Sequence, residues 1–508
     1  MRHISFGIIL ILFLFGCATE LTQETKPPNI IYILADDLGW GDLGCYNSNS
    51  KINTPHLDQF AREGMLFTDA HAPAAVCTPT RYGILTGRYC WRSRLPVGVL
   101  RGYGRALIEP ERMTVAHLLK GQGYHCGVVG KWHLGLDWVV RDEYKDSVPS
   151  DANQVNDVGM VTEMDPQYID FSKKPTDGPL NHGFDYSFIL PASLDMDPYC
   201  FLEDDILVAS PSEYTPGNDL NTGYTGAFWR AGKIAPDFDM VQVTPTFTKK
   251  AIEFVECSVE KKEPFFLYLP FPSPHTPWVP TADFKNTSYA GPYGDFTSMV
   301  DAMVGEILQK LREHDLDENT LVVFTSDNGP FWTAALVEKY NHQAAGTLRG
   351  MKADAWEGGH RIPFIVRWPG KIEAGSKCDT VISLTNLMAT CADILGLQLE
   401  ENQGEDSHSI WPLLSGRGNY QAPEALIQHS SKNYFAIRQG EWKLIAGLGS
   451  GGFSEPSLIE PRQNEPVGQL YNLKQDLAES DNLYALNPEK VAELMQLLEK
   501  FRDTGRSR

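Results

Sequence analysis

The feature that most constrains the fold is a series of short apolar runs, rich in β-branched and aromatic residues, separated by amphipathic segments. The clearest runs are residues 29–34, 126–129, 265–269, 321–325 and 364–367. Runs of this length are typical of parallel strands that are buried on both faces of a sheet. Helical spacing occurs between them, at residues 57–64, 113–120 and 297–312. This alternation predicts an α/β fold with a large, doubly wound, mostly parallel sheet flanked by helices.

The pattern changes near residue 420. Residues 434–445 alternate as a β-hairpin does, and residues 488–501 have the periodicity of an amphipathic helix. We therefore expect residues 29–420 to form the main domain. We expect residues 421–508 to form a small α+β domain with an antiparallel sheet and a terminal helix.

The N-terminus has the pattern of an export signal. Arg2 and His3 precede an apolar run at residues 4–15, which is too short to span a bilayer, and Cys17 follows. This order resembles a bacterial lipoprotein signal, with residues 1–16 as signal peptide and residues 17–28 as a tether lipidated at Cys17. We expect an exported lipoprotein in the periplasm or at the cell surface, anchored to the outer membrane. An ordinary secretory signal is the alternative, and it also takes the chain out of the cytoplasm.

The charge of the chain limits its partners. A formal net charge of −21 excludes general nucleic-acid binding, which needs a basic surface. Seven arginines nevertheless occur close together: Arg81, Arg88, Arg92, Arg94, Arg101, Arg105 and Arg112. They indicate either a positive groove for a polyanion or a solvated loop. The nine cysteines have no close spacing that would indicate a zinc site, and no disulfide pairing follows from the sequence.

Polar side chains follow four of the apolar runs. They are Asp36, Asp37, Lys131, His133, His275, Asp327 and Asn328. Each by itself is compatible with a helix cap, a turn or a solvated residue. Because parallel strands end at the same edge of a sheet, these side chains are expected to meet there. The carboxylates and the amide make a set of hard oxygen ligands, which suits Ca²⁺ or Mg²⁺.

Cys77 stands just before a segment that we predict to be helical. By itself it is compatible with a core residue or with a thiolate activated at a helix N-terminus. A soft thiolate beside a hard cation makes poor chemical sense. The side chain at position 77 is therefore expected not to be a thiol in the active form of the protein.

The segment CTPTRYGILTGR, residues 77–88, resembles the formylglycine signature of the type I sulfatases, a family of the alkaline phosphatase superfamily. Residues 123–135 (GYHCGVVGKWHLG) are similar to the second family signature, although Cys126 replaces a small hydroxyl residue. Further segments match in order, among them NIIYILADDLGWGDLG, PSPHTPW, LVVFTSDNGP, RGMKADAWEGGHRIP and YNLKQDLAESDNL. The resemblance covers nearly all of the chain from about residue 28, which makes the main domain the catalytic domain.

The resemblance implies a nucleophile and a metal. A formylglycine-generating maturase would oxidise Cys77 to an aldehyde, directed by Cys77, Pro79 and Arg81. The implied Ca²⁺ ligands are Asp36, Asp37, Asp327, Asn328 and the formylglycine at position 77. One hydroxyl of the aldehyde hydrate would attack sulfur, and the second would then expel sulfate.

The resemblance also implies roles for the basic residues. Lys352 and His275 would meet the leaving oxygen, with His275 as general acid because histidine titrates near neutral pH. Lys131, with Lys352, would stabilise charge on the sulfate group. Arg81 and His133 would orient the hydrate, and His133 would take the proton that releases sulfate.

A sulfated polysaccharide or glycosaminoglycan oligosaccharide is the expected substrate. The arginines and two aromatic segments, residues 224–229 and 275–278, suit a sulfated sugar. Residues 91–110 also resemble bacterial polysaccharide and glycosaminoglycan sulfatases, including those that act on 6-sulfated N-acetylgalactosamine. Two alternatives stay open: a phosphoesterase or phosphonate hydrolase of the same superfamily, and a non-catalytic lipoprotein that binds sulfated glycans.

Overall fold

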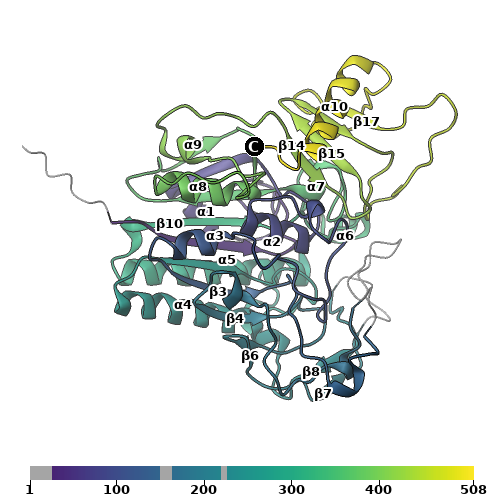
Figure 1. Cartoon of the computed structure of the whole chain (residues 1–508). Coiled ribbons are helices and arrows are strands. Elements are labelled where there is room, and N and C mark those ends of the chain that lie inside the picture. The colour runs from purple at the N-terminus through teal and green to yellow at the C-terminus, as the bar shows by residue number, and fades with distance from the viewer. Residues whose placement is uncertain (1–25, 149–162, 219–225) are drawn as a thin grey trace, which may run out of the picture.

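The computed structural model describes residues 26–148, 163–218 and 226–508 (Figure 1). The predicted signal peptide, Cys17 and most of the tether lie outside these residues. Part of the aromatic segment at residues 224–229 lies outside them too. None of the helices in the described ranges has the length and apolar character needed to cross a membrane.

A mostly parallel sheet forms the centre of the molecule (Figure 1). Its strands, in spatial order, are β12 (Ser376–Cys378), β2 (Met65–His71), β11 (Arg361–Arg367), β10 (Thr320–Ser326), β1 (Asn29–Ala35), β9 (Phe265–Pro270), β3 (His125–Lys131), β4 (Tyr186–Leu190), β5 (Leu202–Glu203) and β6 (Ile206–Leu207), and β13 (Ile382–Ser383) pairs with β2. Strands β10, β1, β9, β3 and β4 are parallel neighbours. The predicted α/β sheet is thus confirmed.

Helices cover both faces of this sheet. One face carries α1 (Pro55–Glu63), α4 (Val243–Lys261) and α5 (Gly291–Glu313), and the other carries α2 (Cys77–Thr86), α3 (Val115–Lys120), α8 (Leu387–Ile394) and α9 (Trp411–Ser415). Strand β1 is buried on both sides, because Ile30, Tyr32 and Leu34 enter one core while Ile31 and Ile33 enter the other. This two-sided burial explains why the strand has a continuous apolar sequence.

The expectation that all five apolar runs form parallel strands is wrong for residues 364–367. They belong to β11, which is antiparallel to both β10 and β2. The chain leaves β10 at the edge that carries Asp327 and passes through α6 (Ala334–Tyr340) and α7 (Glu357–His360). It then enters β11 from that same edge. The Ala72 amide, just beyond the end of β2, donates to the carbonyl of His360, the last residue before β11, which shows that β11 begins where β2 ends. Without a crossover to the opposite edge, the next strand must run in reverse.

The C-terminal region forms a second, antiparallel sheet, as expected. Its strands are β14 (Leu426–His429), β15 (Phe435–Gln439), β16 (Trp442–Ile445) and β17 (Gln469–Asn472), and helix α10 (Pro488–Thr504) packs on it. Strands β15 and β16 are the predicted hairpin. The domain boundary near residue 420 stays a prediction. A separate ribbon pairs β7 (Glu213–Thr215) with β8 (Gly232–Ile234).

Main-chain hydrogen bonds join the C-terminal sheet to the loop that precedes Cys77. The Ala75 amide donates to the His429 carbonyl at 2.9 Å, and the Ala353 amide donates to the Ala75 carbonyl at 2.7 Å. Ser431 in turn donates to Ala353 at 3.0 Å. The segments that carry Cys77 and Lys352 are therefore held against each other and against the C-terminal domain.

Candidate active site

The carboxyl ends of the parallel strands bring the predicted oxygen ligands together. Asp36 and Asp37 follow β1, Asp327 and Asn328 follow β10, and all four side chains are buried. The Asn328 amide donates to Asp37 Oδ1 at 2.7 Å, and the Asp37 main-chain amide donates to Asp327 Oδ1 at 3.3 Å. Ligand atoms of Asp36, Asp37 and His275 all lie within 4.8 Å of one another. The predicted edge of the sheet is therefore a compact acidic centre.

Two of these oxygens lack partners, which tests whether a cation fits. Asp36 Oδ1 and Asn328 Oδ1 are buried and accept no hydrogen bond from any described residue. An unpaired buried acceptor is costly unless a donor or a cation satisfies it. Both are hard oxygen atoms of the kind that bind Ca²⁺. The residues present therefore fit a hard divalent cation.

Basic side chains surround the carboxylates. Lys131 Nζ donates to Asp36 Oδ2 at 2.5 Å, Arg81 Nη2 donates to Asp327 Oδ2 at 2.7 Å, and Lys352 Nζ lies 2.7 Å from Asp37 Oδ1. Burial opposes the charge on Lys352, but the Asp37 carboxylate outweighs it and raises the pKa of Lys352 above its ordinary value. The edge thus combines anionic ligands with basic side chains, and Lys352 among them remains charged at neutral pH.

Burial and neighbouring charges shift the pKa values of Asp36 and Asp327 in opposite directions. Burial raises the pKa of Asp36, but the charge of Lys131, followed by those of His275 and Arg81, outweighs burial and holds this pKa well below its usual range. Burial and the neighbouring Asp36 raise the pKa of Asp327 to about 6, against the opposing charge of Arg81. A divalent cation would favour the ionised form of both carboxylates.

Cys77 is the first residue of α2 and lies in the wall of a cavity of about 330 Å³. Asp37, His275 and Lys352 line the same cavity. Burial raises the pKa of the Cys77 thiol, and the charges of Lys131 and Lys352 oppose the shift without cancelling it. An unmodified Cys77 would thus be a protonated thiol, which is a weak nucleophile.

His133 is held as a neutral imidazole. Its Nε2 donates to the Leu100 carbonyl at 2.8 Å, which leaves Nδ1 as the acceptor, and Nδ1 is buried without a partner among the described residues. Burial, with the charges of Lys131 and Arg81, lowers the pKa of His133 well below its ordinary value. An unprotonated Nδ1 next to this acidic centre is suited to accept a proton.

A family model described as Sulfatase matches residues 28–397. The chain belongs to the sulfatase family. It is 33% identical to an N-acetylgalactosamine-6-O-sulfatase of Bacteroides thetaiotaomicron, over 97% of each chain. It is 31% identical to the N-acetylgalactosamine-6-sulfatase of Sus scrofa, over 80% of this chain and 70% of the relative.

Solved structures agree with this assignment. A sulfatase structure from work on glycosaminoglycan metabolism by Bacteroides thetaiotaomicron superposes with a TM-score of 0.79 at 33% identity, and the match covers 94% of this sulfatase and 100% of that chain. The phosphonate monoester hydrolase of Agrobacterium radiobacter, at 18% identity and a TM-score of 0.56, shares the fold. The chain is therefore a sulfatase with the fold of its superfamily.

His275 reaches the cavity from the loop after β9. Its Nδ1 lies 2.7 Å from the Thr276 carbonyl oxygen, and its Nε2 lies 3.7 Å from Asp37 Oδ2. Asp195, which the apolar runs do not indicate, lies beside His275 in space: its Oδ1 is 3.8 Å from His275 Nδ1, and it pairs with Arg230. Asp195 follows β4, which is not among the five predicted strands. Recognising residues 186–190 as a strand would have identified it.

The arginine-rich segment of the sulfatase does not form one continuous groove. Arg81 is buried with Asp327, Arg101 pairs with Glu163 at 3.1 Å, and Arg112 donates to Glu405 at 2.6 Å. The aromatic segment at residues 275–278 also differs from expectation, because the Trp278 ring packs in the core against Tyr293. Most of these arginines therefore hold the loops around the site together.

A second buried cluster lies between the two domains, around Glu357. His71, Glu357 and His360 place possible metal ligands within 4.8 Å of one another. Cations already occupy the cluster, since Lys443 Nζ lies 3.0 Å from Glu357 Oε1 and Arg361 Nη1 lies 3.2 Å from Glu357 Oε2. This charge balance makes the cluster a buried ion-pair network that joins α7 to β16.

Proposed function

We propose that this sulfatase removes sulfate from a sulfated carbohydrate, a polysaccharide or a glycosaminoglycan oligosaccharide. The nucleophile is a formylglycine made from Cys77, and the metal is a Ca²⁺ held by Asp36, Asp37, Asp327, Asn328 and the modified residue. The observation that carries the proposal is the position of Cys77, in a cavity beside unpaired hard oxygens and two lysines. When present, the formylglycine hydrate supplies a hydroxyl nucleophile and Ca²⁺ supplies a Lewis acid.

The basic residues of the chain then act on the sulfate group and on the nucleophile. Lys131 and Lys352 lie beside the acidic centre and stabilise negative charge as it develops on the sulfate oxygens. Arg81 donates to Asp327 Oδ2 and, at 2.8 Å, to the Lys131 carbonyl. It thereby holds in place the groups that orient the nucleophile. The free Nδ1 of His133 takes the proton when sulfate is expelled.

His275 protonates the leaving oxygen. It lines the cavity together with Lys352. The buried Asp195 carboxylate lies 3.8 Å from its Nδ1. In this role His275 acts as general acid while Lys352 stabilises the alkoxide that begins to form.

The names of the relatives support a choice of substrate. Two of them are named for 6-sulfated N-acetylgalactosamine and are 33% and 31% identical to this sulfatase. A 6-O-sulfated N-acetylgalactosamine unit in a glycosaminoglycan is thus the first substrate to test. We also propose that the enzyme is exported as a lipoprotein anchored through Cys17, and that a formylglycine-generating maturase acts on it before it works.

The proposal is tested by mass spectrometry of the tryptic peptide that contains Cys77, after coexpression with a formylglycine-generating enzyme. Conversion of CH₂SH to CHO lowers the mass by about 18 Da. Sulfate release is measured in parallel on sulfated glycans, with phosphate and phosphonate esters as competing substrates. A modified peptide with sulfate release supports the sulfatase. Faster phosphoester hydrolysis would favour the phosphoesterase, and an unmodified thiol with glycan binding alone would favour the non-catalytic lipoprotein.

Removal of divalent cations is expected to abolish activity and to lower the thermal stability, both restored by Ca²⁺. A ligand at 100 times its dissociation constant stabilises the folded state by about 2.7 kcal/mol. Differential scanning calorimetry across a Ca²⁺ titration measures this shift independently of activity. Asn328→Ala should weaken the shift because it removes an unpaired acceptor, whereas Asn181→Ala at an exposed position should not. Equal Ca²⁺ shifts in both variants would contradict the assigned ligands.

A further inference from the structure

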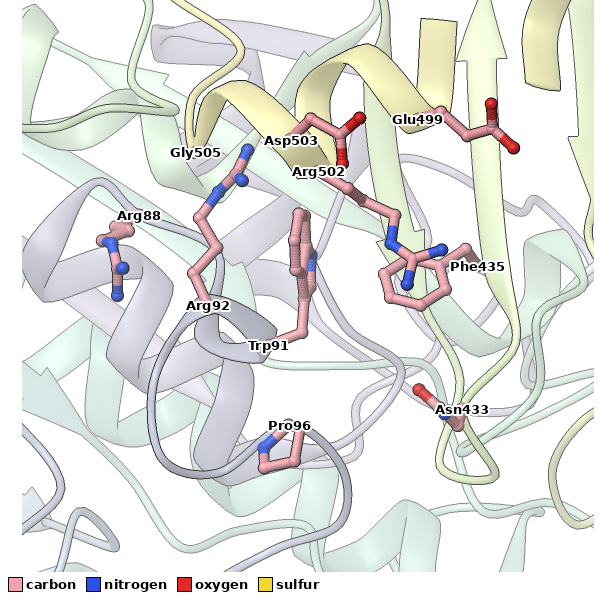
Figure 2. A pocket seen from close by; sticks show the side chains of 10 residues that line it. All are labelled: Arg88, Trp91, Arg92, Pro96, Asn433, Phe435, Glu499, Arg502, Asp503 and Gly505. Atoms are coloured by element: carbon pink, nitrogen blue, oxygen red, sulfur yellow. The ribbon is translucent and has the colours of Figure 1, made fainter. Parts of the chain in front are cut away.

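A second cavity, of about 770 Å³, lies beside the catalytic pocket between the segment that follows α2 and helix α10 (Figure 2). Trp91, Arg92 and Pro96 line it from the catalytic domain, and Asn433, Phe435 and Arg502 line it from the C-terminal domain. In Figure 2, Trp91 stands between Arg92 on one side and the pair formed by Arg502 and Phe435 on the other. The cavity is thus built by two domains that are far apart in the sequence.

The two cavities share a rim. Pro96 lines the second cavity while Gly98 and Val99, two and three residues later, line the catalytic pocket. In the same way Asn433 lines the second cavity, and the preceding residue Lys432 lines the catalytic pocket. Residues 96–99 and 431–433 therefore form one ridge between the pockets. A polymer that leaves the catalytic pocket over this ridge enters the second cavity.

The second cavity offers aromatic rings and an unpaired donor, with one face of Trp91 already covered by Arg92, whose guanidinium carbon lies 4.1 Å from the ring centroid. The Trp91 and Phe435 rings lie 5.3 Å apart, nearly perpendicular to each other at 84°. The C–H face of a pyranose ring packs on such aromatic surfaces, as other apolar groups do. Trp91 Nε1 is buried without an acceptor among the described residues. A buried indole N–H usually has a partner, and a sugar hydroxyl would provide one.

The charges in the second cavity leave one guanidinium free for an anion. Arg92 is neutralised by Asp406, with two contacts of 2.9 Å. Arg502 is exposed and stacks over Phe435, with its guanidinium carbon 5.1 Å from the ring centroid. Within the described part of the chain Arg502 has no ion pair, although Glu499 and Asp503 also line the cavity. A guanidinium of this kind pairs with a sulfate or a carboxylate through two parallel hydrogen bonds.

We propose that the second cavity binds a distal sugar unit of the same anionic polysaccharide whose sulfated unit lies in the catalytic pocket. This inference rests on the proposed function and extends it. Trp91 packs on the sugar ring, and Arg502 pairs with a sulfate or carboxylate of that unit. The enzyme therefore prefers oligosaccharides long enough to cross the ridge over disaccharides, which fill the catalytic pocket alone.

The test is a size series of one N-acetylgalactosamine-containing sulfated glycosaminoglycan, from disaccharide to octasaccharide. Arg502→Glu is expected to lower kcat/KM for the octasaccharide by about tenfold, mostly through KM, and to leave the disaccharide unchanged. Arg462→Glu is the matched control, because Arg462 is 87% exposed on the same domain and lies outside the cavity. An equal loss on every length, or no loss on any length, would overturn the proposal.

A second variant and a binding measurement separate this proposal from the proposed function. Trp91→Phe keeps an aromatic ring against Tyr89 but removes the indole N–H, and it should also weaken the octasaccharide selectively. Calorimetric titration of the Cys77→Ala protein with each oligosaccharide measures affinity without turnover. If no substrate releases sulfate, the proposed function fails. The cavity is then supported by octasaccharide binding that Arg502→Glu weakens, and is excluded by binding that does not depend on length or on Arg502.

Discussion

Replacing Cys77 with alanine is expected to lower the rate of sulfate release by roughly 10⁴-fold or more, while the protein stays folded. Loss of a covalent nucleophile has effects of this order or larger. Cys77 begins α2 and is buried, but its side chain lies at the cavity wall, where removing one sulfur atom disturbs little packing. Sulfate release by ion chromatography and thermal unfolding are to be measured on the same preparations.

A matched control separates the chemistry of position 77 from general effects of cysteine loss. Among the described residues all cysteines are free, and Cys257 is exposed. Cys257→Ala should therefore retain full activity, and its Cys77 peptide should show the same loss of mass as in the parent protein. If Cys77→Ala retained sulfate release within tenfold of the parent, position 77 would not supply the nucleophile.

The second large effect is expected on stability. Lys443→Met should lower the free energy of unfolding by about 3–5 kcal/mol, the usual result of removing one partner from a buried ion pair. Lys443 is fully buried and lies 3.0 Å from Glu357 Oε1 and 2.9 Å from Glu479 Oε1. Methionine has a similar length but no charge, so two buried acids lose a shared cation. Urea and thermal unfolding measure the loss.

The expected loss depends on pH. Burial opposes ionisation of Glu357, but Lys443, with His71 and His360, outweighs it and holds the pKa of Glu357 well below its ordinary value. A lowered folded-state pKa stabilises the protein above the unfolded pKa, and this stabilisation is lost as the pH falls through the folded pKa. The difference between Lys443→Met and the parent should thus be large at pH 7 and shrink below about pH 4. A difference that grows on acidification would contradict this assignment.

An exposed lysine provides the control. Lys500 pairs with Glu424 at 2.7 Å, but both side chains are about half exposed, at 55% and 51%. Lys500→Met should cost less than about 1 kcal/mol, because exposed ion pairs contribute little. Adding Glu357→Gln to Lys443→Met should recover part of the loss, since it removes the unpaired charge. A double-mutant cycle measures the coupling between the two residues.

Much of the site was accessible from sequence because its residues follow strands that are locally recognisable. Asp36 and Asp37 follow β1, Lys131 ends β3, and Asp327 follows β10. In parallel strands buried on both faces, the apolar run itself marks where the polar edge begins. The same local rule failed for Asp195, because β4 was not recognised as a strand.

Features that depend on non-local geometry were not accessible. The direction of β11 depends on which edge the chain occupies after β10, and the apolar run at residues 364–367 reads the same in either direction. The arginines after Cys77 have carboxylate partners such as Glu405 and Asp406, more than 290 residues away. Sequence spacing says nothing about such pairs, so a solvated loop and a groove remained equally open.

By itself, the sequence determined the α/β class of the fold, the strand ends and the donor set beside Cys77, because burial and strand periodicity are local properties of the chain. The tertiary structure decided the rest: the reversal of β11, the Asp195 neighbour of His275, and the docking of the C-terminal sheet against the Cys77 loop. The second cavity belongs to this group, since its walls come from segments more than 300 residues apart. Such features arise where distant segments pack together, and packing partners are selected by the whole fold.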